Sequence, residues 1–320
     1  MSFTPSRAFR RLTALTAIAT YLLIVVGGVV RVTGSGLGCG DKDQWPFCHG
    51  QWLPPLERTA LIEFSHRWVA ATATFLVLLL AAWVWMRYRQ VRWLRIGASV
   101  VVLLFIAQIA LGAITVEFNL PSGVIMVHLA NALLLLGALV WIAVRTAMAG
   151  SSSRTSPSQS TLRLTTTIVG ATYLLALSGA LVVDQGAGGA CSGWPLCGNG
   201  FQLSSGQYAE INLLHRLVAG AVVLLLGYSM TRVRRSRPGD HALVLSSRVV
   251  LLLVVAQVAA GALVVELHLP PAARALHLAL ASALWASVVV TAVLTRGTST
   301  AAAADRHGVE HAARTRMAAS

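Results

Sequence analysis

The chain gathers its apolar residues into long runs, and runs of this length are typical of helices that lie in lipid. About 20 residues at a rise of 1.5 Å match a hydrocarbon core roughly 30 Å thick. Hydrophobic residues make up 56% of the 320 residues and charged residues only 11%. The sequence therefore predicts an all-α membrane protein with eight transmembrane helices, near residues 12–30, 61–86, 94–116, 123–144, 164–183, 211–231, 249–265 and 272–294.

Basic residues are concentrated on one side of these spans. The formal net charge of +14 is by itself compatible with a nucleic-acid partner. The arginines, however, cluster before the first span and after the second, fourth, sixth and eighth spans. Such an excess in short loops marks the cytoplasmic side of a membrane protein. The sequence therefore predicts a cell-membrane protein with both termini in the cytoplasm, and nucleic-acid binding is the weaker interpretation.

The sequence also contains an internal duplication. Residues 107–121 read AQIALGAITVEFNLP and residues 256–270 read AQVAAGALVVELHLP, which is a separation of 149 positions. The same separation relates His66 to His215, His128 to His277 and Cys48 to Cys197. A separation of 152 relates Cys39 to Cys191. Four spans return the chain to the side where it began, so the two copies are parallel repeats.

The duplication divides the chain into two four-helix bundles. The first bundle is expected at residues 1–149 and the second at residues 163–296. The segment 150–162 is rich in Ser and Thr and is expected to be a cytoplasmic linker. Residues 297–320 are Ala-rich and charged, which predicts a cytoplasmic tail.

Four histidines stand inside the predicted spans at matched positions of the two copies: His66, His128, His215 and His277. An ionisable side chain in hydrocarbon is costly, which favours a functional role. A single such histidine is explained equally well by a hydrogen bond to a neighbouring helix. Four at matched positions favour ligation, and all four lie near the outer ends of their helices.

Two histidines per bundle favour a haem over a zinc or copper ion. A zinc or copper site requires three or four ligands close together. A haem iron ligated by imidazole on both faces requires only two, and it fits between the helices of a bundle. The sequence therefore predicts one haem site in each copy.

The two copies differ at one polar position beside a histidine. Glu63 precedes His66 by one helical turn, whereas Asn212 stands at the matching position before His215. A carboxylate beside one haem only indicates chemistry in the first copy and electron handling in the second. The alternative is an exposed interfacial acid.

Arg67 and Arg216 directly follow two of these histidines. Their guanidinium groups are candidates for contacts with haem propionates. Snorkelling toward the lipid headgroups is an equally good explanation. The sequence leaves both interpretations open.

All four cysteines lie in two outer loops, as Cys39 with Cys48 and as Cys191 with Cys197. An outer loop faces an oxidising compartment, which predicts a disulfide within each loop. Closing such short rings contributes about 2 to 3 kcal/mol if the stabilisation comes from chain entropy. A structural role and a redox role are both open, and the structural role is stronger for Cys191 and Cys197.

Taken together, these features resemble the haem A synthase family. The resemblance rests on the stretch 63–67 (EFSHR), the stretch 212–216 (NLLHR), the two later histidines, and the cysteine pairs with Trp-Pro between them. It spans all eight helices, and the cysteine pairs resemble the bacterial branch of the family.

The resemblance implies an oxidoreductase that converts the C8 methyl group of haem O to the formyl group of haem A, by successive hydroxylations and loss of water. It implies that His66 and His128 flank the substrate haem and that Glu63 acts in the oxidation. It implies that His215 and His277 ligate a resident haem b. Cys39 and Cys48 would take part in redox exchange or substrate transfer. The implied partners are haem O synthase, which supplies the substrate, and terminal-oxidase assembly downstream.

Two other functions stay open from the residues alone. A b-type cytochrome with bis-histidine haems would only pass electrons, and it has no evident need for Glu63 in one copy. A haem transporter would use a cavity between the halves, and it has no evident need for four axial ligands. The residues do not identify the electron donor.

Overall fold

The computed structural model of the chain describes residues 4–40, 47–149, 158–197 and 206–297. These residues form eight α-helices and one short 3₁₀ turn, and no strand occurs among them. The helices are α1 (Arg7–Val32), α2 (Arg58–Arg87), α3 (Arg92–Glu117), α4 (Ser122–Met148), α5 (Gln159–Asp184), α6 (Gln207–Ser236), α7 (His241–Glu266) and α8 (Pro271–Arg296), with the turn η1 at Ala187–Gly189. Each predicted span lies inside one helix, and the all-α membrane fold is confirmed.

The helices begin where the sequence supplies capping groups. Ser6, Ser158 and Asp240 each accept a hydrogen bond from the backbone N–H three residues later, which satisfies a donor that a helix start leaves free. α8 begins instead with Pro271, which has no N–H to satisfy. Apolar residues then continue around the whole circumference of each helix, so that large side chains such as Leu224 and Leu252 are 76% and 69% exposed. Such surfaces are stable against lipid, and all eight helices are long and apolar enough to cross a membrane.

The duplication is repeated in the helix boundaries. α5 begins and ends 152 positions after α1, and α6 and α7 begin and end 149 positions after α2 and α3. α8 begins 149 positions after α4. α5 starts at Gln159, four residues inside the segment that was expected to be linker, because Ser158 caps it there. The rest of that linker, 150–157, and the tail from residue 298 lie outside the described residues.

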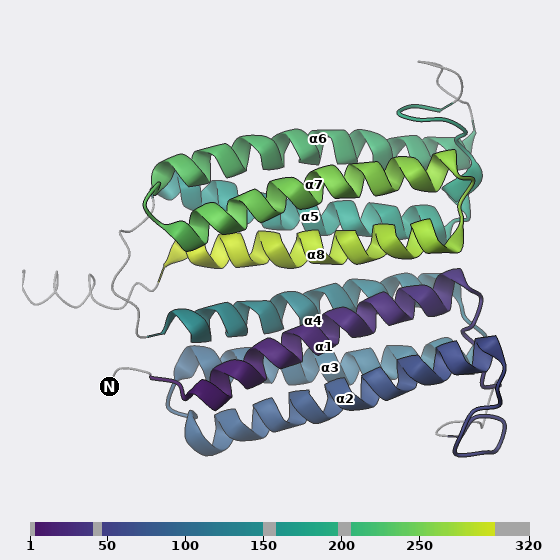
Figure 1. Cartoon of the computed structure of the whole chain (residues 1–320), viewed down its shortest axis with the longest axis horizontal. Helices are drawn as coiled ribbons and strands as arrows, with labels where there is room; N and C mark the ends of the chain where they lie inside the picture. The colour runs from purple at the N-terminus through teal and green to yellow at the C-terminus, as the bar shows by residue number, and fades with distance from the viewer. Residues whose placement is uncertain (1–3, 41–46, 150–157, 198–205, 298–320) are drawn as a thin grey trace, which may run out of the picture.

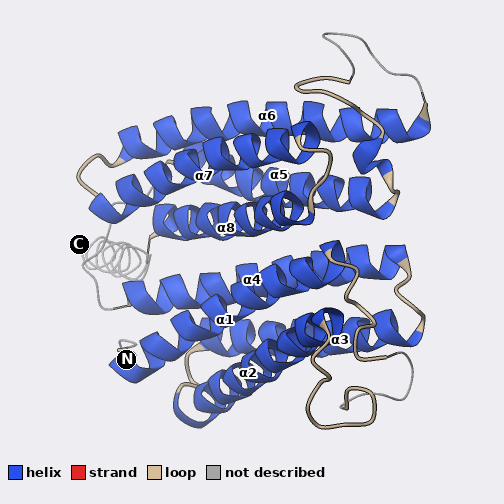
Figure 2. Ribbon diagram, turned by 45° about the vertical axis from the view of Figure 1, so that its right-hand side comes forward, coloured by secondary structure: helices blue, strands red, loops and turns tan. Residues whose placement is uncertain are grey.

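The helices form two four-helix bundles side by side (Figures 1 and 2), α1–α4 and α5–α8. They meet through α8, which packs against α1 and α4, and through α4 against α5. One continuous core of buried residues runs from the first bundle into α8. The helices that carry His128 and His277, α4 and α8, are therefore neighbours across the junction.

The junction has reciprocal hydrogen bonds that follow the duplication. Tyr21 on α1 donates to the carbonyl of Ala279 on α8 at 3.3 Å, and Tyr173 on α5 donates to the carbonyl of Ala130 on α4 at 3.2 Å. Each tyrosine therefore reaches a carbonyl two residues after a histidine of the other bundle. Trp285 of α8 breaks the symmetry, because its Nε1–H donates to a carbonyl of α4 at 2.8 Å and only Leu136 stands at its matching position.

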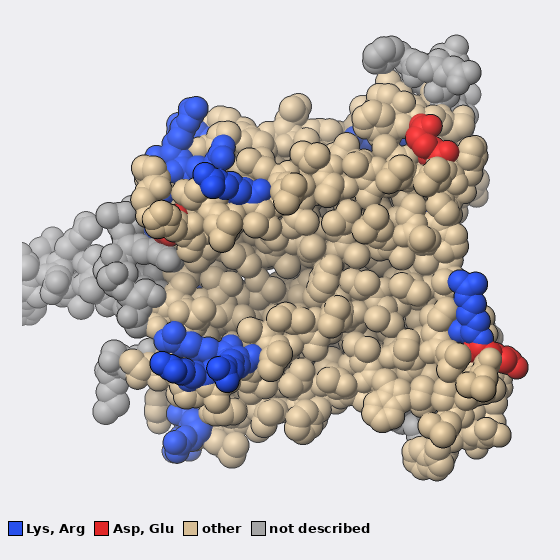
Figure 3. Space-filling view, in the orientation of Figure 1, with Lys and Arg blue, Asp and Glu red and all other residues tan. Residues whose placement is uncertain are grey.

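Charged side chains are separated along the helix direction. Most of the basic residues visible in Figure 3 gather at the end where α1 begins and where the α2–α3 and α6–α7 turns lie. The opposite end carries the two disulfides, Cys39–Cys48 and Cys191–Cys197, and is called the disulfide end here. The apolar belt between these ends is the part of the surface that suits lipid.

Candidate functional site

The four matched histidines all lie at the disulfide end. His66 and His128 begin the membrane-crossing parts of α2 and α4, and they lie within electrostatic range of each other. His215 and His277 are related in the same way on α6 and α8. The structure thus brings together the two histidines of each bundle that the sequence paired.

In the first bundle, each imidazole lies against a glycine of the preceding helix. A Cβ on Gly27 of α1 would stand 3.2 Å from Nε2 of His66. A Cβ on Gly112 of α3 would stand 3.4 Å from Cε1 of His128. The absence of a side chain lets the ring approach the neighbouring backbone.

The second bundle repeats these contacts. A Cβ on Gly179 of α5 would stand 3.1 Å from Cε1 of His215, and a Cβ on Gly261 of α7 would stand 3.0 Å from Cε1 of His277. These glycines were not among the residues singled out from the sequence. Their signal was present, since Gly179 follows Gly27 by 152 positions and Gly261 follows Gly112 by 149. We call the four glycines the glycine cradles.

The ring nitrogens of His128 and His277 have similar but unequal partners. Nε2 of His128 lies 3.0 Å from Nε2 of Gln108, and Nε2 of His277 lies 3.3 Å from Nε2 of Gln257, the residue that matches Gln108. The Nδ1 atoms of both histidines are buried and have no hydrogen-bond partner within the described part of the chain. Each ring therefore retains an unpartnered nitrogen.

His215 has a partner that His66 lacks. Ser178 donates its hydroxyl proton to the carbonyl of Leu175 at 2.8 Å. Its contact with Nδ1 of His215, also 2.8 Å, is therefore a hydrogen bond that Nδ1–H donates. Nε2 of His215 then carries the lone pair that a metal requires. Val26 occupies the matching position beside His66 and can make no such bond.

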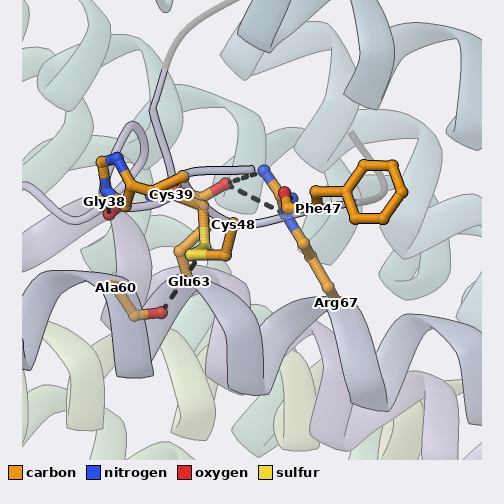
Figure 4. A network of polar contacts seen from close by, with 8 residues as sticks. Gly38, Cys39, Phe47, Cys48, Ala60, Glu63 and Arg67 are labelled. Carbon is orange, nitrogen blue, oxygen red and sulfur yellow. Dashed lines mark hydrogen bonds and ion pairs between the residues drawn. A yellow bond between two sulfur atoms is a disulfide. The ribbon is translucent and has the colours of Figure 1, made fainter. Parts of the chain in front are cut away.

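Glu63 lies beneath the first disulfide loop and not at the surface (Figure 4). Its side chain is buried, with the residue 4% exposed, so the structure excludes an exposed interfacial acid. Oε2 accepts the backbone N–H of Cys39 at 2.8 Å, and Oε1 accepts two N–H groups of Arg67 at 2.6 and 3.1 Å. Arg67 also donates to the carbonyl of Phe47 at 2.8 Å. The carboxylate is thus bound both to the loop and to the arginine that follows His66.

Asn212 accepts from its arginine as Glu63 does, but its hydrogen bond to the loop of the second bundle has the opposite direction. Its Oδ1 accepts from Nε of Arg216 at 2.9 Å, and its Nδ2 donates to the carbonyl of Ala187 at 2.8 Å. The first loop presents a backbone N–H to Glu63, whereas the second loop presents a carbonyl to Asn212. Each loop therefore meets the side chain that complements it: a carboxylate accepts from the first loop, and an amide donates to the second.

Both arginines bind the backbone of a disulfide loop. Arg216 donates to the carbonyls of Cys191 and Leu196 at 3.1 and 3.0 Å, as Arg67 donates to that of Phe47. Contact with haem propionates stays a prediction for both arginines. The disulfide predicted within each loop is present, and all four cysteines are buried. Trp45 and Pro46, which contributed to the family resemblance, lie outside the described residues.

Comparison with known proteins identifies the family. The family model COX15-CtaA, described as "Cytochrome oxidase assembly protein", matches residues 10–61 and 56–289. A "Heme A synthase" of Shouchella clausii (strain KSM-K16) is 34% identical over 268 residues, which cover 81% of this chain and 87% of the relative. The chain belongs to the haem A synthase family. A second "Heme A synthase", from Geobacillus kaustophilus (strain HTA426), is 30% identical over 291 residues and 88% of each chain.

The geometry of this haem A synthase family member suits a haem in each bundle. The donor set in each bundle is a pair of neighbouring imidazoles, which is the number of nitrogen ligands that a haem iron takes on its two faces. The glycine cradles let all four imidazoles pack against bare backbone, in the same way in both bundles. Among the residues that the structure describes, no group of three or more His, Cys, Asp or Glu side chains is placed to hold a metal ion. The residues present therefore fit a haem iron with two axial ligands.

Proposed function

We propose that this chain is a haem A synthase that oxidises the C8 methyl group of haem O to the formyl group of haem A. The oxidation proceeds by successive hydroxylations and loss of water, and its product serves terminal oxidases. Family membership makes the chain a membrane-bound, haem-modifying oxidoreductase. The observation that carries the proposal is the pair of histidine sites, which are matched in their glycine cradles and differ in the polar groups around them.

The two sites divide the work between substrate and cofactor. His66 and His128 hold the substrate haem O in the first bundle. His215 and His277 hold a resident haem b in the second bundle. The Ser178 hydroxyl supports this assignment, because it fixes His215 with the Nε2 lone pair free for iron. A haem b held there supplies one-electron redox chemistry.

Glu63 acts in the oxidation as a group that exchanges a proton at its carboxylate oxygens. It lies one turn before His66 on the same helix, is buried, and has Arg67 beside it to balance its charge. Proton exchange by a positioned carboxylate is a common contribution to catalysis. The hydrogen bond that Glu63 accepts from the backbone N–H of Cys39 connects the acid to the disulfide loop. Cys39 and Cys48 take part in redox exchange or in transfer of the substrate.

The orientation in the membrane follows from the charges. The basic end of the bundles lies in the cytoplasm with both termini, and the disulfide end with the haem sites lies near the outer face. The gathering of basic side chains at one end supports this orientation. Haem O synthase is the partner that supplies the substrate, and terminal-oxidase assembly uses the product.

The test is to express the full chain with a supply of haem O and to identify the extracted haems by chromatography and mass. We expect haem A from the parent chain and none from His66→Ala or His128→Ala at normal protein level. A parent chain that contains haem b and leaves haem O unchanged would instead be an electron-transfer cytochrome. That outcome overturns the proposal.

A further inference from the structure

The hydrogen-bond network around His128 fixes which ring nitrogen carries its proton. Nδ2 of Asn131 lies 2.8 Å from the carbonyl of Leu104, and a carbonyl only accepts, so Nδ2 is the donor. The same Nδ2 donates to Oε1 of Gln108 at 2.7 Å. The other end of the Gln108 amide, Nε2, is therefore the end that faces His128.

This orientation places a donor against Nε2 of His128. An amide N–H requires a lone pair, so Nε2 of the imidazole is the unprotonated nitrogen and Nδ1 carries the proton. Iron needs an unprotonated imidazole nitrogen. The only lone pair that the ring offers is thus already bound to Gln108, and a haem iron must displace that hydrogen bond to bind Nε2.

In the second bundle, Gln257 matches Gln108, but no asparagine holds its amide. Leu280 stands at the position that matches Asn131, 149 positions later. Oε1 of Gln257 is buried and has no hydrogen-bond partner in the part of the chain that the structure describes. Its Nε2 lies farther from the ring, at 3.3 Å instead of 3.0 Å. A buried amide oxygen without a partner is unfavourable. Iron therefore displaces Gln257 from His277 more easily than it displaces Gln108 from His128.

We propose that Asn131 makes Gln108 a competitor of iron for Nε2 of His128, so that the haem of the first bundle is exchangeable. Leu280 leaves Gln257 a weak competitor, so that the haem of the second bundle is retained. When haem enters the first site, the Gln108–His128 hydrogen bond breaks and an iron–nitrogen bond forms. When haem leaves, the hydrogen bond re-forms. A substrate and its product have to exchange and a resident cofactor has to stay, so the inference rests on the proposed function and explains how one ligand pair serves each task.

The experiment exchanges the two residues between the bundles. Asn131→Leu gives the first bundle the residue of the second, and Leu280→Asn does the reverse. The full chain is purified in detergent and loaded with haem b as the probe, and haem release is followed by transfer to an excess of an apo-globin. His128→Ala and His277→Ala identify which phase of release belongs to which bundle.

We expect Asn131→Leu to slow release from the first bundle by up to roughly 3- to 10-fold, because Gln108 takes up the Nε2 lone pair as the iron–nitrogen bond breaks and one complete hydrogen bond is worth about that factor. Leu280→Asn should speed release from the second bundle by a similar factor. Gln108→Leu removes the competitor directly and should slow release at least as much as Asn131→Leu, which keeps the test available if the latter folds poorly.

The outcomes separate this inference from the proposed function. If the chain binds haem in a His128-dependent phase and neither Asn131→Leu nor Gln108→Leu slows that phase, the competitor role is wrong and the haem site stands. If no release phase depends on His128, both the site assignment and the inference fail. Faster release from Asn131→Leu also overturns the inference, because Asn131 would then support the bound haem.

Discussion

The two bundles share their framework and differ in the polar groups beside it. Helix boundaries, glycine cradles and the arginines bound to the loops repeat at fixed separations. Three differences concern the surroundings of the histidines and their loops: Glu63 against Asn212, Asn131 against Leu280, and Val26 against Ser178. The second bundle thus has a serine bonded to His215 and a glutamine without support beside His277. The first bundle has a firmly placed glutamine beside His128 and a buried acid bound to the disulfide loop. A few hydrogen-bonding groups beside the histidines therefore distinguish the tasks of two copies that share one helical framework.

The sharpest test of the comparison removes an axial ligand from each bundle. His215→Ala or His277→Ala should remove the low-spin haem b from the purified protein, because one imidazole cannot complete the axial pair. His66→Ala and His128→Ala should leave that haem in place and abolish haem A formation. Absorption spectra and extracted-haem content measure both effects. An unchanged low-spin spectrum in both second-bundle variants would contradict the division of tasks.

The acid of the first bundle is the next largest difference. Glu63→Gln should lower haem A output by about 100-fold or more, within the range that proton-exchanging groups contribute. The glutamine amide has only one acceptor oxygen, so either Cys39 N–H or Arg67 loses its acceptor, which costs about 1 to 3 kcal/mol of loop stability. Haem A per folded molecule, with haem b as the internal reference, separates these two effects.

Two variants serve as controls for Glu63. Glu63→Asp keeps the charge and withdraws it by about one methylene, so it should retain more activity than Glu63→Gln if the charge is required. Asn212→Asp places a carboxylate opposite the carbonyl of Ala187 and should disturb the second loop without affecting the first site. Normal haem A output per molecule from Glu63→Gln would leave this acid with the task of holding the loop alone.

The glycine cradles should be equivalent in the two bundles. Gly27→Ala and Gly179→Ala each put a methyl group against an imidazole, at 3.2 and 3.1 Å, and overpacking of this kind costs roughly 1 to 3 kcal/mol. We expect reduced haem content from the corresponding bundle in each case. Gly170→Ala and Gly220→Ala are matched controls in helices, because a Cβ at these positions meets nothing within 4 Å. Equal haem content in cradle and control variants would show that the close approach is not needed.

The junction between the bundles should give the smallest and most symmetric effect. Tyr21→Phe and Tyr173→Phe each remove one hydrogen bond across the junction, and each should lower stability by about 0.5 to 1.5 kcal/mol. Thermal unfolding in detergent measures the loss. A large difference in stability loss between the two variants would mean that the two hydrogen bonds contribute unequally to the junction.

The sequence by itself determined the helices, the duplication and the four histidines. A membrane helix is specified locally, because each apolar run satisfies its own backbone hydrogen bonds and needs only lipid around it. The duplication then assigned His66 and His128 to one copy and His215 and His277 to the other, and their places near the outer ends of their helices paired them without any knowledge of packing. The disulfides were also predictable, because short loops leave each cysteine one near partner.

Only the tertiary structure decided what surrounds those histidines. The sequence placed Glu63 beside His66 but did not show that its carboxylate binds Cys39 and Arg67, because the path of the loop over α2 depends on long-range contacts. The same holds for the glycine cradles and for the pairing of Asn131 with Gln108, which lie on different helices. How far each helix is rotated about its axis is set by packing against its neighbours, and that rotation selects which polar group meets each imidazole.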